Sequence, residues 1–169
     1  MYLCTMNSKS GIVAFSGHRN YDGSGEEALR EAIASLYAAG AREFRVGMAE
    51  GFDLAAAEAV LEFKRKHGDV RLVAIVPWPL FFTGFKRENE LRYFKIIAAA
   101  SVVRYVGAVY VDNIYFKRND MLIDGANHVV AWWHGGPSGT GYTVRQARRQ
   151  KIEIINLYAK RQLSFDFNV

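Results

Sequence analysis

The stretch HVVAWWHGGPSGTGYTVRQARRQ, residues 128–150, decides the fold of this chain. It reads as a buried strand, the loop GGPSGT (135–140) and a polar helix. Glycines at such a crossing let the backbone approach a ligand closely and adopt positive φ. The helix that follows offers unpaired N–H groups to an anion, and Ser138 and Thr140 add hydroxyl donors. The loop therefore predicts a phosphate site, although glycines at this place also serve turn geometry alone.

Two other predicted strands end in loops of the same kind. Residues 42–46 precede GMAEGFD (47–53), which opens a helix with Asp53 as the expected N-cap. The first strand ends at Gly17, followed by His18 and Arg19. Ligands of open α/β sheets bind outside the carboxyl ends of the strands. We therefore expect the three loops to converge on one crevice.

Apolar runs of strand length alternate with helical stretches along the whole chain. The predicted strands cover residues 12–16, 42–46, 71–76, 101–106, 128–133 and 153–157, and the predicted helices cover 25–39, 54–66, 86–99, 113–125 and 140–150. This alternation predicts a three-layer, Rossmann-like α/β fold, an open and mostly parallel sheet of about six strands with helices on both faces. The length of 169 residues predicts a single domain, with tails at 1–10 and 159–169.

The composition limits the class of protein. Half of the residues are hydrophobic and 14% are aromatic, which excludes disordered and coiled-coil classes. No apolar run reaches the roughly 18 residues of a membrane span, and the first ten residues lack the apolar segment of a signal peptide. Together with the single cysteine, Cys4, these features favour a cytoplasmic protein without a membrane partner. The four histidines show no metal-ligand spacing, so no metal is expected.

The charge balance favours anionic partners. There are 22 Lys and Arg against 17 Asp and Glu, a net charge of +5. The densest basic cluster, Arg145, Arg148, Arg149 and Lys151, follows the GGPSGT loop. It reads either as a solvated helix face with cations near the helix C-terminus or as an edge that faces a polyanion.

The C-terminal tail permits two interpretations. Apolar residues at alternate positions of QLSFDF (162–167) are typical of an edge strand packed on the core. Alternatively, Gln162 followed at offsets of three and five by Phe165 and Phe167 resembles the short peptides that dock into the bacterial replication sliding clamp.

Three segments together resemble the SLOG superfamily. They are GMAEGFDLAAAEAV (47–60), YFKRNDM (115–121) and GGPSGTGYTVRQA (135–147). This Rossmann-like group includes the DprA recombination mediator, the LOG phosphoribohydrolases and many nucleotide-sensor domains. The chain is most similar to the YpsA-like branch, over residues 11–157. The resemblance implies a nucleotide or nucleotide-derived ligand in a pocket between these segments.

The predicted ligand-binding residues lie in the loops that should form this pocket. They are Gly17, His18, Arg19, Gly47, Glu50, Gly51, Asp53, Arg118, Asn119, Gly135, Gly136, Ser138, Gly139 and Thr140. Among them, Gly136 and Gly139 are expected to adopt positive φ and to leave room for the phosphate. Arg118 and Arg19 are expected to pair with phosphate oxygens.

The resemblance leaves enzymatic activity open. Arg118 falls on an arginine that the phosphoribohydrolases carry, but Thr143 stands where they have a catalytic glutamate and His134 replaces a proline. Their oxocarbenium-like transition state needs a nearby carboxylate. Glu50 and Asp53, with Arg118, are the remaining catalytic candidates.

Three functions follow from these observations. The leading one is a nucleotide-binding sensor or regulatory domain. The others are a nucleotide N-glycoside hydrolase and a DprA-like binder of single-stranded nucleic acid, which the positive charge supports. A homo-oligomer is compatible with all three. An enclosed pocket at GGPSGT would favour a mononucleotide, and an open basic groove would favour a strand.

Overall fold

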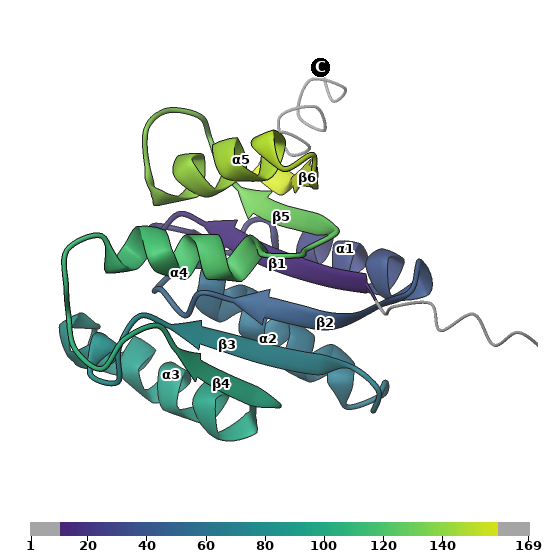
Figure 1. Ribbon diagram of the computed structural model, residues 1–169. Helices are drawn as coiled ribbons and strands as arrows, with labels where there is room; N and C mark the ends of the chain where they lie inside the picture. The colour runs from purple at the N-terminus through teal and green to yellow at the C-terminus, as the bar shows by residue number, and fades with distance from the viewer. Residues whose placement is uncertain (1–10, 159–169) are drawn as a thin grey trace, which may run out of the picture.

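The computed structural model describes residues 11–158 (Figure 1). Its strands are β1 (Gly11–Gly17), β2 (Ala41–Val46), β3 (Arg71–Val76), β4 (Val102–Tyr105), β5 (His128–Trp132) and β6 (Glu153–Asn156). Its helices are α1 (Glu26–Ala38), α2 (Phe52–Lys64), the 3-10 helix η1 (Phe81–Gly84), α3 (Arg87–Ala99), α4 (Ile114–Ile123) and α5 (Gly139–Arg149). Within this range no helix is long and apolar enough to span a membrane. The two predicted tails, with the proposed clamp-docking peptide, lie outside the described residues.

The six strands form one sheet in the order β4-β3-β2-β1-β5-β6, and every neighbouring pair is parallel. The predicted α/β fold is therefore confirmed. From β1 the chain adds strands toward one edge up to β4 and then returns to place β5 on the other side of β1. The reversal makes the carboxyl ends of β1 and β5 the topological switch point, where sheets of this type bind ligands.

Helices cover both faces of the sheet, with α1, α2 and α3 on one face and α4 and α5 on the other (Figure 1). Successive strand residues point to opposite faces, so Phe15 packs in the core under α1–α3 and Ala14 in the core under α4 and α5. Strands buried on both faces read as the continuous apolar runs that predicted them.

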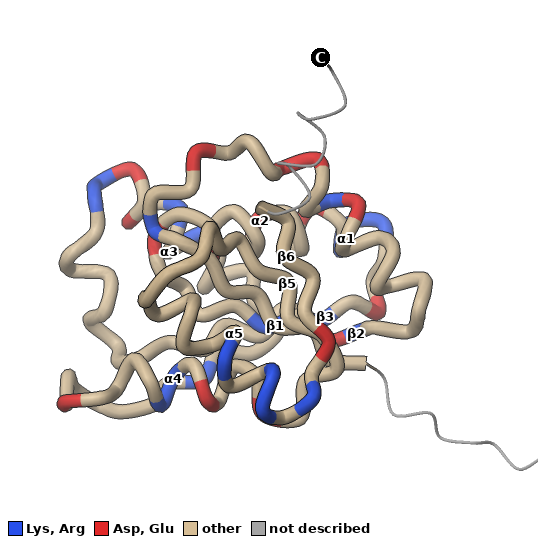
Figure 2. The backbone as a smooth tube through the Cα atoms, turned by 90° about the horizontal axis from the view of Figure 1, so that it is seen from above, with Lys and Arg blue, Asp and Glu red and all other residues tan. Residues whose placement is uncertain are grey.

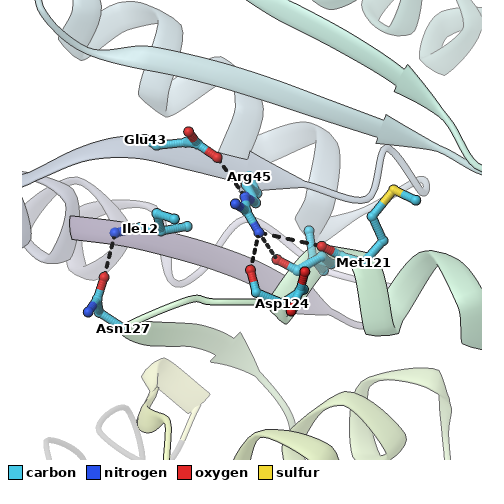
Figure 3. Close-up of polar contacts among 7 residues, drawn as sticks. Ile12, Glu43, Arg45, Met121, Asp124 and Asn127 are labelled. Carbon is cyan, nitrogen blue, oxygen red and sulfur yellow. Dashed lines mark hydrogen bonds and ion pairs between the residues drawn. The ribbon is translucent and has the colours of Figure 1, made fainter. Parts of the chain in front are cut away.

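A buried arginine ties α4 to the sheet (Figure 3). Arg45 on β2 donates from Nε to Oε1 of Glu43 at 2.7 Å and from Nη1 to the main-chain oxygen of Asp124 at 2.6 Å. Longer bonds of 3.5 Å reach the carbonyls of Met121 and Leu122. The last carbonyls of a helix have no partner within it, and the guanidinium supplies one. Strand β2 therefore fixes the end of α4, whose first turns face the candidate site.

The start of α2 differs from the prediction that Asp53 is its N-cap. The helix begins at Phe52, and Gly51 is the N-cap with φ +81°. A Cβ at Gly51 would lie 2.3 Å from the carbonyl oxygen of Arg19, so this close approach of two loops requires glycine. Asp53 consequently lies in the first turn, where its Oδ2 accepts a hydrogen bond from the Ala49 N–H at 3.2 Å.

Candidate functional site

A cavity of about 1020 Å³ lies at the switch point, at the upper end of the size range of small-molecule sites. Its walls come from the end of β1, the loop before α4, the first turns of α4 and the start of α5. The lining residues are Ser16, Gly17, His18, Arg19, Ala49, Asp53, Tyr110, Asp112, Asn113, Tyr115, Phe116, Arg118, Asn119, Leu122, Ser138, Gly139, Thr140, Tyr142 and Arg145.

Most of the predicted site residues lie around this one cavity. Those that line it are Gly17, His18, Arg19, Asp53, Arg118, Asn119, Ser138, Gly139 and Thr140. The remaining ones, Gly47, Glu50, Gly51, Gly135 and Gly136, are not among the lining residues. The three strand-end loops thus meet at one cavity. The predicted residues that do not line it have other roles in the structure.

Glu50 forms hydrogen bonds with the start of α3. Its Oε1 accepts hydrogen bonds from the main-chain N–H of Lys86 at 2.8 Å and from Nδ2 of Asn89 at 3.0 Å. A carboxylate at a helix N-terminus satisfies donors that the helix leaves unpaired. The carboxylate of Glu50 therefore binds the N-terminus of α3 and does not line the cavity.

The glycines of the GGPSGT loop have different roles. Gly135 and Gly136 adopt positive φ, of +97° and +80°, and form the turn. Gly139 is the first residue of α5 and does not have positive φ, so that part of the expectation for Gly139 is wrong. Positive φ is confined to the turn because the helix starts at Gly139. A Cβ on Gly139 would meet only Nδ2 of Asn119, at 3.9 Å.

The N-terminus of α5 presents main-chain donors to the cavity. Ser138 is the N-cap, and its Oγ accepts a hydrogen bond from the Gly141 N–H at 3.0 Å. The N–H groups of Gly139 and Thr140 belong to the first turn, so no carbonyl within the helix can accept from them. Both residues line the cavity. The positive end of the helix dipole points the same way, so an anion is favoured here.

A buried arginine and a buried aspartate lie at the base of the cavity. Arg118 donates from Nε to Oδ1 of Asn119 at 2.7 Å and from Nη1 to the carbonyl of Gly47. A Cβ on Gly47 would lie 2.6 Å from Nη1 of Arg118 and 2.9 Å from Oδ2 of Asp53. The missing side chain at Gly47 therefore allows Arg118 to approach Asp53.

Burial dominates the charge state of both groups. It raises the pKa of Asp53 to about 6, although the charge of Arg118 acts in the opposite direction. It also lowers the pKa of Arg118, against the charge of Asp53. A close ion pair would shift each pKa the other way. In the described part of the chain, no ion pair joins them, so neither charge is fully compensated.

His18 connects the loop after β1 to the loop after β5. Its Nε2 accepts the main-chain N–H of His134 at 3.3 Å, and the two imidazole rings stack with centroids 4.0 Å apart. The pKa of His18 is lowered, mainly by burial and to a smaller extent by the neighbouring His134. The neutral imidazole is the form that can accept this hydrogen bond.

Sequence reasoning missed the aromatic part of the cavity. Tyr110, Tyr115, Phe116 and Tyr142 all line it. Tyr115 and Phe116 belong to the YFKRNDM segment, directly before Lys117 and Arg118, so their place in this motif could have indicated them. The loop that carries Tyr110 has no glycine-rich motif.

The position of the phosphoribohydrolase glutamate is inside the helix. Thr143 is fully buried, and its Oγ1 donates to the carbonyl of Gly139 at 3.1 Å. The carboxylates among the cavity-lining residues are those of Asp53 and Asp112. No group of three or more possible metal ligands occurs within residues 11–158.

Two solved structures share the fold. DNA processing protein A from Helicobacter pylori, which binds single-stranded DNA, aligns with a TM-score of 0.63 at 19% identity, over 85% of this chain and 63% of its own. DprA from Streptococcus pneumoniae aligns with a TM-score of 0.62 at 18% identity, over 86% of this chain and 50% of its own. The chain thus spans about half to two thirds of the length of these proteins.

The family comparison covers more of the sequence than any single motif. No curated protein matches the chain. A model of the YspA SLOG family (YpsA), however, matches residues 24–166, which include the three segments that carry the SLOG resemblance. Because the match extends over most of its length, the chain belongs to the YspA (YpsA) SLOG family.

Proposed function

We propose that the chain binds a nucleotide or nucleotide-derived ligand through its phosphate, in the cavity at the β1–β5 switch point, as a sensor or regulatory domain. The observation that carries this proposal is the buried guanidinium of Arg118. Its hydrogen-bond partners within residues 11–158 are neutral oxygens, and burial lowers its pKa. An anionic ligand would compensate the part of this charge that Asp53 leaves uncompensated.

Two further features support a phosphate in particular. The first turn of α5 offers main-chain N–H groups next to the hydroxyls of Ser138 and Thr140. Arg19, exposed at the end of β1, adds a second guanidinium to the lining. The SLOG resemblance implies the same class of ligand.

The test compares a nucleoside 5′-monophosphate with its nucleoside by isothermal titration calorimetry. Arg118→Ala should weaken the nucleotide by roughly 1.5–3 kcal/mol, the value of a charge-assisted hydrogen bond, and leave the nucleoside nearly unchanged. Arg104→Ala, at an exposed arginine of β4 outside the lining, is the matched control. Equal losses for both ligands would give Arg118 a structural role. Native mass spectrometry of freshly purified protein would identify a nucleotide that copurifies.

Binding of single-stranded nucleic acid is the second candidate. Three arginines lie along α5 (Figure 2), where Arg145 lines the cavity and Arg148 and Arg149 are exposed. The H. pylori protein that shares the fold binds single-stranded DNA. Fluorescence anisotropy with a labelled oligonucleotide at two salt concentrations tests this. A steep salt dependence that is lost when the three arginines become alanine would support it. Mononucleotide binding without such dependence would favour the first proposal.

A nucleotide N-glycoside hydrolase is the enzymatic alternative. Asp53, whose pKa is raised to about 6, is the lining carboxyl suited to donate a proton to a leaving group. The buried Thr143 supplies no second carboxylate. A turnover assay on nucleoside monophosphates separates the two proposals, since robust hydrolysis by the wild type would refute the sensor assignment.

A further inference from the structure

We infer that the cavity contains a second subsite, a stacking platform made by Phe116 and supported by Tyr142, which takes the heteroaromatic base of the ligand. This inference rests on the proposed function, because it places the base of the nucleotide whose phosphate binds at α5.

The platform is built from the first turns of two neighbouring helices. The ring of Phe116 on α4 lies 4.6 Å from that of Tyr142 on α5, with 60° between the planes. Tyr142 is held in turn, because its hydroxyl donates to Oδ1 of Asp120 at 2.8 Å. Phe116 therefore rests on a ring that is itself fixed by a hydrogen bond to α4.

Phe116 lines the cavity and remains partly exposed. It is 45% exposed, and within the described residues Tyr142 is its one aromatic contact. The other aromatic pair of the lining, Tyr110 and Tyr115, packs edge-on against Trp78, with ring centroids 5.3 and 5.8 Å away. Phe116 thus has fewer aromatic neighbours than Tyr110, which is 55% exposed but contacts both Trp78 and Tyr115. Water in contact with an apolar ring is unfavourable, and a stacked base would remove it.

The platform lies at the right distance from the phosphate end. Tyr142 follows Gly139 by three residues, so both lie on the same side of α5, about 4.5 Å apart along the helix axis at a rise of about 1.5 Å per residue. A sugar that joins a base to its 5′-phosphate spans such a gap. The cavity of about 1020 Å³ has room for all three parts of the ligand.

The test uses the four common ribonucleoside 5′-monophosphates and ribose 5-phosphate, which keeps the sugar and phosphate but lacks the base. Phe116→Ala should weaken at least one nucleoside monophosphate about tenfold or more, equivalent to about 1.4 kcal/mol, and leave ribose 5-phosphate unchanged. Phe116→Trp should retain nucleotide affinity. Phe94→Ala is the control, because Phe94 on α3 has the same exposed fraction, 45%, and lies outside the lining.

The outcomes separate this inference from the proposed function. If Phe116→Ala weakens nucleotides and ribose 5-phosphate equally, or leaves both unchanged while Arg118→Ala still weakens them, the stacking platform is refuted and the phosphate site stands. If the wild-type protein binds none of the probes, both proposals fail. Loss of nucleotide binding on Phe94→Ala to the same extent would also refute the platform, since the effect would then not depend on the cavity.

Discussion

Replacing Asp53 by asparagine should stabilise the protein at neutral pH. Burial raises the pKa of this carboxyl from the ordinary 3.8 to about 6 in the folded state, so folding favours the protonated form. The contribution of Asp53 to stability is therefore fully present below pH 3.8 and is lost as the pH rises through about 6. Asparagine resembles the protonated carboxyl and does not ionise.

The size of the effect follows from the two pKa values. The difference between 3.8 and about 6 corresponds, at about 1.4 kcal/mol per pKa unit, to about 3 kcal/mol at pH 7 or above. For a domain of this size that equals a rise in melting temperature of about 6–12 °C. At pH 4 the variant and the wild type should differ by less than about 1 kcal/mol, because the folded-state carboxyl is then already neutral.

Urea unfolding of both proteins at pH 4, 5.5 and 7.5 measures this difference. Asp112→Asn is the matched control, because Asp112 also lines the cavity but is exposed, and its replacement should change stability by less than about 0.5 kcal/mol. A variant that is less stable than the wild type at pH 7.5 would refute the reasoning. It would mean that the attraction between Asp53 and Arg118 outweighs the cost of burial.

Three substitutions elsewhere test the fold around the site. Gly51→Ala should lower the free energy of unfolding by more than about 1 kcal/mol in a urea titration, because its Cβ would lie 2.3 Å from a backbone carbonyl oxygen. Gly23→Ala is the control: Gly23 has a similar φ of +82° but open surroundings, so this change should cost less. Arg45→Met should destabilise by about 1.5–3 kcal/mol and speed amide hydrogen exchange in the last turn of α4, and slowed or unchanged exchange there would contradict the capping role. Thr143→Glu should lower the melting temperature and should not restore hydrolysis, because burying a carboxylate at this fully buried position costs about 2 kcal/mol or more. A stable variant that hydrolyses nucleoside monophosphates would overturn this prediction.

The type and order of the elements could be predicted because parallel strands buried on both faces leave short continuous apolar runs in the sequence. The close approach of Arg19 to Gly51 could not be predicted. It goes with Gly51 as the N-cap of α2, so that Asp53 lies in the first turn. Glu50 was assigned to the pocket from its place in GMAEGFD, yet it binds the start of α3, more than thirty residues away in sequence. Such pairings depend on tertiary contacts that no local pattern contains.

The aromatic wall was missed for a topological reason. Strand β4 lies at the edge of the sheet, and the chain must return from it across β3 and β2 to reach β5 beside β1. The loop that begins this return carries Tyr110 to the cavity. The order of strands is not readable from apolar periodicity, so a loop after an edge strand gave no reason to expect a ligand contact.

Because Gly47 has no side chain, ligand binding at the site could affect the helices on both faces of the sheet. The sheet separates α4 and α5 from α2, and at the end of β2 the guanidinium of Arg118 bonds to Gly47 and faces Asp53 on α2. A ligand held by Arg118 and the first turn of α5 would therefore act on both outer layers at once. Its binding energy would oppose sliding of one helical layer relative to the other, so that partial opening of either layer becomes rarer when the site is filled. If the domain is the sensor proposed above, a small molecule bound at the carboxyl ends of the strands would change the rigidity of the whole domain.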